Sequence, residues 1–189
     1  MFAFKKEYFL IIQSINDINL NFIKKYNKFN IIYRNLDGKD KFDNILKFRN
    51  KCRLKRINFF IANNTRLAVL IKADGIYLSS YNKNLKSLNF SNSQFKLIGS
   101  AHNFKEINQK IKQGCQKVVV SKLFTVNNKP DGIIHGVVKF NNLFSFYRNI
   151  IPLGGIKLQN INKLKMIKSN AFTIMSEIKK KPTISSRLF

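Results

Sequence analysis

Eight short apolar segments recur along the chain, at residues 8–12, 30–34, 58–62, 75–79, 95–100, 117–124, 149–153 and 171–175. They are nearly continuous runs of aliphatic and aromatic residues, without a strict alternation of apolar and polar side chains. Such runs are typical of strands that are buried on both faces, as in a parallel sheet. This pattern constrains the fold more than any other feature of the sequence.

Stretches that favour helices separate these segments, and we expect helices at about 15–26, 39–55, 65–72, 82–88, 104–113, 139–147 and 158–168. Asn103, followed three residues later by Glu106, predicts that one helix begins at Phe104. Alternation of strands and helices indicates an α/β fold, and eight strands predict a (β/α)8 TIM barrel of parallel strands. Such barrels typically have about 250 residues. A chain of 189 residues must therefore form a compact version with short loops.

Neither a composition break nor a linker divides the sequence, so we expect one barrel domain over residues 1–178. Residues 179–189 form a basic tail that starts with three lysines and contains Pro182, which does not favour a helix. The apolar runs are much shorter than the roughly 20 residues that a membrane-spanning helix needs. These features predict a cytoplasmic protein with no membrane partner.

The cysteines and histidines do not form a recognisable metal or redox motif. Cys52 and Cys115 are far apart in the sequence and are expected to be small buried side chains in a reducing compartment. His102 is expected to be structural, and His135 is expected to lie solvated in a loop.

The charge balance is strongly basic, with 35 Lys and Arg against nine Asp and Glu and a net charge of +26. Such a charge favours polyanions, including nucleic acid. The lysines are spread along the whole chain, however, and Asn, Ile and Phe are also frequent, as in proteins encoded by AT-rich codons. No signature of a nucleic-acid-binding fold accompanies them. We therefore expect a compositional origin and no nucleic-acid partner, with polyanion binding and attraction of small anionic substrates as alternatives.

A pair of glycines, Gly154 and Gly155, follows the seventh expected strand. Glycines at such a position let the backbone approach a ligand closely and leave N–H groups free to face an anion. In (β/α)8 barrels, phosphate frequently binds at the loops after strands seven and eight, and Ser176 follows strand eight. The sequence predicts a phosphate site of Gly154, Gly155 and Ser176, although a tight turn alone would also explain the glycine pair.

Five segments contain short motifs, namely ADGIYLS at 73–79, IGSAH at 98–102, LFTVNNK at 123–129, IPLGGI at 151–156 and AFTIMS at 171–176. They resemble motifs of the thiamine phosphate synthase/TenI family, which are ADGVHLG, IGxSAH, PxFPTxTK, the ending of strand seven and ADGVAVxS, in the same order. Each motif is weakly specific alone. The five occur in order and at compatible spacings from about Ile31 to Ile178, which is most of the chain.

The resemblance implies a transferase of thiamine biosynthesis that joins a hydroxymethylpyrimidine diphosphate to a thiazole phosphate and releases pyrophosphate. It also implies Mg²⁺ and positive side chains that stabilise the departing pyrophosphate. The family's site falls on Gly154, Gly155 and Ser176 for the thiazole phosphate and on Arg34, Asn63, Ser100 and Lys129 for the pyrimidine and its diphosphate.

Three charged residues of the family's pattern are missing. Leu36 stands where the strand-two motif QxREK has a pyrophosphate-binding lysine. Asn64 and Asn82 stand where the family has aspartates that hold Mg²⁺. Because an amide lacks the charge of a carboxylate, we expect Mg²⁺ to bind weakly or not at all at these two positions.

Several functions therefore stay open. The first is a thiamine phosphate synthase-like transferase that acts on small phosphorylated pyrimidine and thiazole ligands with a diverged magnesium and diphosphate site. The second is a TenI-like protein that binds or salvages thiazole phosphate, although Lys122 stands at the position of TenI's histidine. The third is a non-catalytic paralogue, and a basic nucleic-acid-binding protein is a distant fourth. Whether the chain forms a homo-oligomer is also open.

Overall fold

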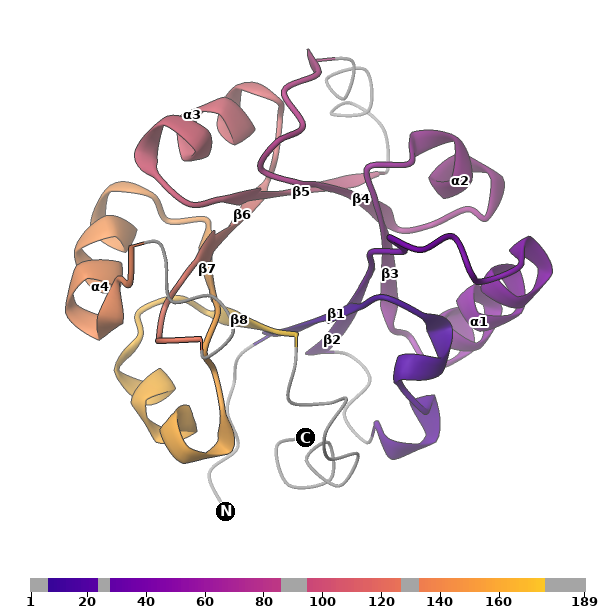
Figure 1. Ribbon diagram of the computed structural model, residues 1–189, viewed down its shortest axis with the longest axis horizontal. Helices are drawn as coiled ribbons and strands as arrows, with labels where there is room; N and C mark the ends of the chain where they lie inside the picture. The colour runs from indigo at the N-terminus through magenta and orange to yellow at the C-terminus, as the bar shows by residue number, and fades with distance from the viewer. Residues whose placement is uncertain (1–6, 24–27, 86–94, 127–132, 176–189) are drawn as a thin grey trace.

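The computed structural model of the chain describes residues 7–23, 28–85, 95–126 and 133–175, which form a closed barrel of parallel strands (Figure 1). The strands are β1 (Glu7–Ile12), β2 (Phe29–Tyr33), β3 (Asn58–Ala62), β4 (Gly75–Leu78), β5 (Lys96–Ala101), β6 (Lys117–Ser121), β7 (Ile150–Leu153) and β8 (Ala171–Ile174). Each strand pairs with the next, and β8 pairs with β1 through Glu7 and Ala171. The predicted (β/α)8 barrel is confirmed.

Apolar side chains fill the inside of the barrel. Alternate residues of every strand point inward and form one cluster of Phe9, Ile11, Ile32, Phe60, Tyr77, Ile98, Val119, Ile151 and Ala171. At the amino-terminal end of the strands, Lys117 forms an ion pair with Glu7, and the Asn58 amide donates to the Asn30 Oδ1 at 2.7 Å. The lumen is therefore a packed core, and the opposite end of the barrel is left to carry ligand-binding groups.

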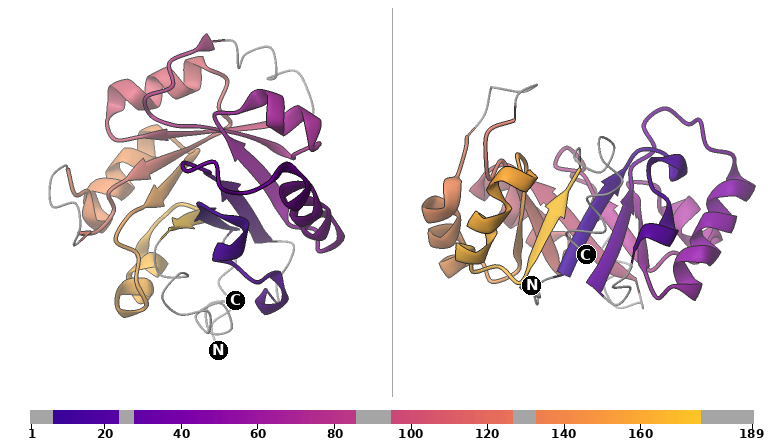
Figure 2. Two further views of the ribbon diagram at one scale, coloured as in Figure 1. Left: turned by 45° about the vertical axis from the view of Figure 1, so that its right-hand side comes forward. Right: turned by 90° about the horizontal axis from the view of Figure 1, so that it is seen from below.

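Helices surround the barrel and bury a second apolar core against the outer face of the strands (Figures 1 and 2). They are α1 (Phe42–Leu54), α2 (Thr65–Leu70), α3 (Phe104–Lys112), α4 (Gly136–Phe146) and the 3₁₀ segment η5 (Leu158–Met166). The predicted start of α3 is confirmed, since Asn103 Oδ1 accepts the N–H of Glu106 at 2.9 Å. Cys52 and Cys115 are both buried free thiols, as expected.

The helix expected at 15–26 is wrong in its described part. This connection forms two 3₁₀ turns, η1 (Ile15–Asp17) and η2 (Leu20–Phe22). Ser14 Oγ accepts the N–H of Asn16 at 3.2 Å, and Asn19 Oδ1 accepts the N–H of Asn21 at 3.0 Å. Such short side-chain-to-backbone bonds compete with a continuous helix. The shortened connection borders a groove of about 780 Å³ against α1.

Two further boundaries differ from the expectation. The sixth strand ends at Ser121 and not at 124. Beyond it, Leu123 and Phe124 still donate their N–H groups to the carbonyls of Leu153 and Gly154, at 2.8 and 3.0 Å. Residues 82–84 are not helical, and the remainder of the helix expected at 82–88 lies mostly outside the described residues.

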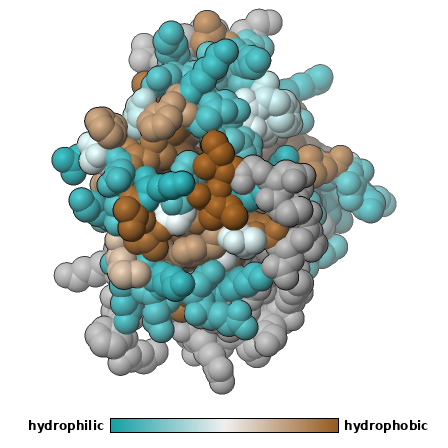
Figure 3. All heavy atoms as spheres, turned by 60° about the vertical axis from the view of Figure 1, so that its left-hand side comes forward, coloured by the Kyte–Doolittle hydropathy of each residue, from teal (hydrophilic) through white to brown (hydrophobic). Residues whose placement is uncertain are grey.

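The surface carries its lysines on several sides of the barrel. The face turned forward in Figure 3 shows hydrophilic side chains around a group of apolar ones. Exposed lysines lie on several helices around the barrel, including Lys47 and Lys51 on α1, Lys105 and Lys112 on α3, and Lys163 and Lys165 on η5. Within the described ranges, no helix is both long and apolar enough to cross a membrane. The basic tail at 179–189 lies outside them.

Candidate functional site

The carboxyl ends of all the strands meet at one face of the barrel, here called the mouth (Figure 2). The loops that follow the strands bring the described candidate residues to this face: Arg34 after β2, Asn63 and Asn64 after β3, Asn82 after β4, Ser100 near the end of β5, and Gly154 and Gly155 after β7. Two other predicted residues, Lys129 and Ser176, lie outside the described residues.

Arg34 and Ser100, from the ends of β2 and β5, lie near Tyr77 of the packed lumen. Tyr77 is almost fully buried, and its phenol hydrogen-bonds with Ser100. Burial raises the pKa of Tyr77, while the hydrogen bond from Ser100 and the positive charge of Arg34 act in the opposite direction. The Arg34 Nε is buried and has no hydrogen-bond partner among the described residues. A buried donor without a partner is rare in folded proteins, so this N–H needs an acceptor that the described residues do not supply.

Asn63 organises the loop after β4. Its backbone has a φ of 56°, in the left-handed region that asparagine tolerates better than most residues. Its Nδ2 donates to the Ser79 Oγ at 2.7 Å and to the Tyr81 hydroxyl at 2.8 Å. Its Oδ1 accepts from the Ser79 N–H at 3.0 Å and from the Asn82 Nδ2 at 3.2 Å. The structure therefore joins two of the predicted site residues, Asn63 and Asn82, through their amides.

Asn64 has a different task. Its Oδ1 accepts the N–H of Leu67 at 2.9 Å and thereby caps the first turn of α2. The side chain of Asn64 is exposed. The two asparagines predicted at the metal positions thus differ in their bonding. Both accept a backbone N–H with the amide oxygen, but Asn82 also donates to Asn63 with its nitrogen.

The glycine pair makes a turn that packs against the loop after β6. Gly154 and Gly155 have φ angles of +97° and +66°. A Cβ on Gly155 would lie 2.5 Å from the carbonyl oxygen of Phe124, so no larger residue fits without moving that backbone. The Gly155 carbonyl accepts from Asn160 Nδ2 at 2.6 Å, whereas the Gly155 N–H has no acceptor among the described residues. The turn explains the glycines, and phosphate binding by the N–H stays a prediction.

Sequence reasoning missed several polar groups around the mouth. The Thr173 hydroxyl is fully buried and has no partner among the described residues. His135 was expected to be solvated, but it precedes α4 half-buried, and its Nε2 is buried without a described partner. Burial, and then the positive charge of Lys139, lower the pKa of His135. Lys110, on α3, is fully buried behind the loop after β4. None of the three stands out by spacing or motif.

Fold and site together define a class, namely a TIM barrel whose candidate ligand site lies at the carboxyl end of its strands. The model of the thiamine monophosphate synthase family matches residues 24–178 of the chain. The chain therefore belongs to the thiamine monophosphate synthase family, which confirms the resemblance found in its motifs.

Curated relatives carry the same description at low identity. The thiamine-phosphate synthase of Clostridioides difficile is 24% identical over 160 residues, covering 82% of this chain and 75% of that relative. The thiamine-phosphate synthase of Prochlorococcus marinus subsp. pastoris is 29% identical over 136 residues, covering 68% of this chain but 37% of that relative. The chain thus spans well under half of the cyanobacterial protein.

Solved structures support the fold. The thiamine phosphate pyrophosphorylase from Pyrococcus furiosus superposes with a TM-score of 0.68 and 12% identity over 98% of both chains. KGPDC from Streptococcus mutans superposes with a TM-score of 0.67 and 7% identity, covering 96% of this chain and 92% of that one. At these identities the likeness shows the architecture alone.

The family is generally Mg²⁺-dependent, and the donors at the mouth do not fit that ion. Mg²⁺ is usually held by one or two carboxylates together with phosphate oxygens and water. The described residues include no group of three His, Cys, Asp or Glu side chains that could hold a metal. The amide oxygens of Asn63, Asn64 and Asn82 each already accept a hydrogen bond from the protein. An ion bound by these amide oxygens would meet no negative charge to offset its dehydration.

Proposed function

We propose that the chain is a thiamine phosphate synthase-type transferase with an altered diphosphate site. It would join a hydroxymethylpyrimidine diphosphate to a thiazole phosphate and release pyrophosphate. Membership of the family supports the reaction type. The observation that carries the assignment to this mouth is the unpartnered, buried Arg34 Nε beside Tyr77 and Ser100.

The chemistry asks for two half-sites. The pyrimidine half needs polar groups around the ring and positive charge at the leaving diphosphate, and Arg34 with Ser100 offers a charged donor and a hydroxyl. The thiazole half needs donors for a single phosphate, and the Gly155 N–H is available in the described structure. A positive side chain that faces developing charge in a water-poor site commonly contributes about a hundredfold or more in rate.

The second candidate is a protein that binds thiazole phosphate without efficient condensation. It is favoured by the state of the pyrimidine half, where Asn64 and Asn82 replace carboxylates and are engaged in hydrogen bonds within the protein. Both candidates keep the thiazole phosphate as a ligand. They differ in whether the diphosphate is bound and released.

Turnover separates the two candidates. The protein is incubated with both substrates, with and without MgCl₂, and formation of thiamine phosphate and pyrophosphate is followed together. We expect slow condensation with a weak dependence on Mg²⁺, and binding of thiazole phosphate in calorimetry. Absence of condensation with retained thiazole phosphate binding selects the second candidate. Absence of binding of either substrate refutes both.

A matched pair of variants tests the role of the mouth. Arg34→Gln removes the positive charge beside Tyr77, and Arg53→Gln removes one from the exposed face of α1. We expect Arg34→Gln to lower the rate about a hundredfold, and Arg53→Gln to leave it within about twofold because exposed charges interact weakly with distant sites. Equal losses in the two variants would mean that Arg34 contributes only general charge.

A further inference from the structure

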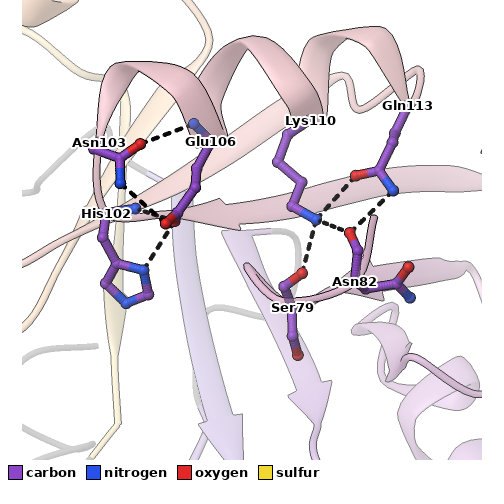
Figure 4. A network of polar contacts seen from close by, with 7 residues as sticks. All are labelled: Ser79, Asn82, His102, Asn103, Glu106, Lys110 and Gln113. Atoms are coloured by element: carbon purple, nitrogen blue, oxygen red, sulfur yellow. Dashed lines mark hydrogen bonds and ion pairs between the residues drawn. The ribbon is translucent and has the colours of Figure 1, made fainter. Parts of the chain in front are cut away.

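Lys110 is a buried lysine in the outer layer of the barrel. It lies on α3 with no exposed surface, and its ammonium donates to three oxygens (Figure 4). These are the Ser79 carbonyl at 2.7 Å, the Asn82 carbonyl at 2.6 Å and the Gln113 Oε1 at 2.9 Å. An ammonium has three N–H donors, so all of them are used. No carboxylate in the described part of the chain forms an ion pair with it.

Burial of a lysine without a carboxylate partner is costly and uncommon, so a specific task is needed to explain it. A glycine on the neighbouring strand β5 leaves space for this side chain. A Cβ on Gly99 of β5 would lie 2.7 Å from both the Cγ and the Cδ of Lys110. Gly99 therefore lets the stem of Lys110 pass over β5 toward the loop after β4.

Gln113 completes the attachment of this loop to α3. Its Nε2 donates to the carbonyls of Asn82 and Asn84, at 3.0 and 2.8 Å (the Asn82 contact is drawn in Figure 4). Lys110 and Gln113 together therefore bind the loop carbonyls of Ser79, Asn82 and Asn84. Within the loop itself, Asn82 donates its N–H to the Ser79 carbonyl at 2.9 Å. Much of the loop's geometry thus comes from Lys110 of α3 and from Gln113, which directly follows that helix.

The same loop carries the polar groups that meet Asn63. The Ser79 N–H and the Asn82 Nδ2 both donate to the Asn63 Oδ1, at 3.0 and 3.2 Å. The carbonyls that Lys110 holds belong to these same two residues. A change in how Lys110 holds the loop would therefore move the side of the mouth that carries Asn63 and Asn82. The glycine turn after β7 does not contact this network in the described structure.

We propose that Lys110 is a positioning residue for the pyrimidine and diphosphate half of the site. It fixes the loop after β4 so that the Asn82 and Ser79 groups converge on Asn63, and it leaves the thiazole half untouched. Its positive charge, unpaired with a carboxylate, also favours an anion over a divalent cation in front of this loop. The proposal rests on the proposed function for the identity of the two ligands.

The test compares two lysines of α3, Lys110→Met inside and Lys112→Met on the exposed face. Methionine keeps the length and apolar stem of lysine but donates no hydrogen bond. Affinities for inorganic pyrophosphate and thiazole phosphate are measured by calorimetry, and hydrogen exchange is followed at residues 79–85 and in β7. We expect Lys110→Met to weaken pyrophosphate binding at least about tenfold, with thiazole phosphate within about twofold and faster exchange confined to the loop. Lys112→Met should match the wild type in all measurements.

Three outcomes would overturn the proposal: equal losses for both ligands, unchanged loop exchange in Lys110→Met, or the same changes in Lys112→Met. Where Lys110→Met does not fold, Gln113→Leu removes the other attachment of the loop and is judged by the same criteria. A wild type that binds neither ligand refutes the proposed function. Loop exchange then still decides whether Lys110 holds the loop.

Discussion

The directions of two hydrogen bonds predict that Asn64→Asp and Asn82→Asp will have opposite effects on stability. Asn64 accepts a hydrogen bond from the N–H of Leu67, and an aspartate accepts the same bond at the same place. Asp and Asn are about equally good at this position, and a negative charge at the start of a helix is favourable by about 0.3–1 kcal/mol. Asn64→Asp should therefore be neutral or slightly stabilising.

Asn82 uses both ends of its amide. Its Nδ2 donates to the Asn63 Oδ1 at 3.2 Å, and a carboxylate at this place has no hydrogen to donate. Asn82→Asp loses this bond and sets two acceptor oxygens against each other, which costs about 1–3 kcal/mol. The hydrogen bond from the Asn84 N–H, which is 3.0 Å long in the wild type, becomes charge-assisted and therefore stronger, which offsets part of this loss. We expect a net destabilisation of about 1–2 kcal/mol.

Urea unfolding at pH 7 without metal measures both variants against the wild type. In thermal unfolding, the expected loss of unfolding free energy in Asn82→Asp corresponds to a decrease of roughly 2–8 °C in the midpoint for a chain of this size. Shifts of the same sign and size in the two variants would refute the reasoning, because the two sites would then respond to charge alone. If added MgCl₂ raises the unfolding free energy of Asn82→Asp but not that of Asn64→Asp, the carboxylate at 82 has created a metal ligand.

Three further predictions concern stability and partners. Gly155→Ala should destabilise the fold by about 2–4 kcal/mol in urea unfolding, since it adds a contact with Phe124 to the cost of a left-handed alanine. Gly38→Ala, also left-handed but in open space, should cost only about 1 kcal/mol. Although partial burial acts to raise it, hydrogen bonds from His102 hold the pKa of Glu106 below 4.5. The stability that Glu106 contributes should thus be present above pH 4.5 and lost as the pH falls through the lowered pKa. The difference in unfolding free energy between Glu106→Gln and the wild type should therefore shrink in acid. Binding to a DNA duplex should be weak at about 150 mM salt, and tight binding there in a filter assay would restore the nucleic-acid hypothesis.

The strands of this barrel could be predicted because burial on both faces leaves a plain record in the sequence. Segments such as 58–62 and 117–121 are apolar almost throughout, and each became a strand with its expected start. The first helix was predicted wrongly for a local reason. The side chains of Ser14 and Asn19 accept nearby backbone N–H groups, and apolar spacing alone does not reveal that competition.

The placement of the candidate residues at strand ends could be predicted, but their contacts could not. Motif and spacing placed Arg34, Asn63 and Ser100 at strand ends, where the structure has them. Motif comparison treated Asn64 and Asn82 as equivalent losses of charge, whereas one caps a helix and the other bonds with Asn63. Lys110 resembles every other lysine in a basic sequence, and its burial follows only from the three-dimensional path over Gly99.

Closure of the barrel has a consequence for the synthesis of the protein on the ribosome. One edge of β1 pairs with β8, the last strand, and this pairing includes Glu7 and Ala171. On the ribosome, synthesis of the stretch between these residues lasts roughly 10–30 s at ~5–20 residues per second. During that time one edge of β1 offers unpaired N–H and C=O groups beside an apolar lumen, which is a template for pairing with other nascent chains. Nascent chains on crowded polysomes should therefore aggregate more readily than the finished protein. A chaperone that shields β1 early should increase the soluble yield.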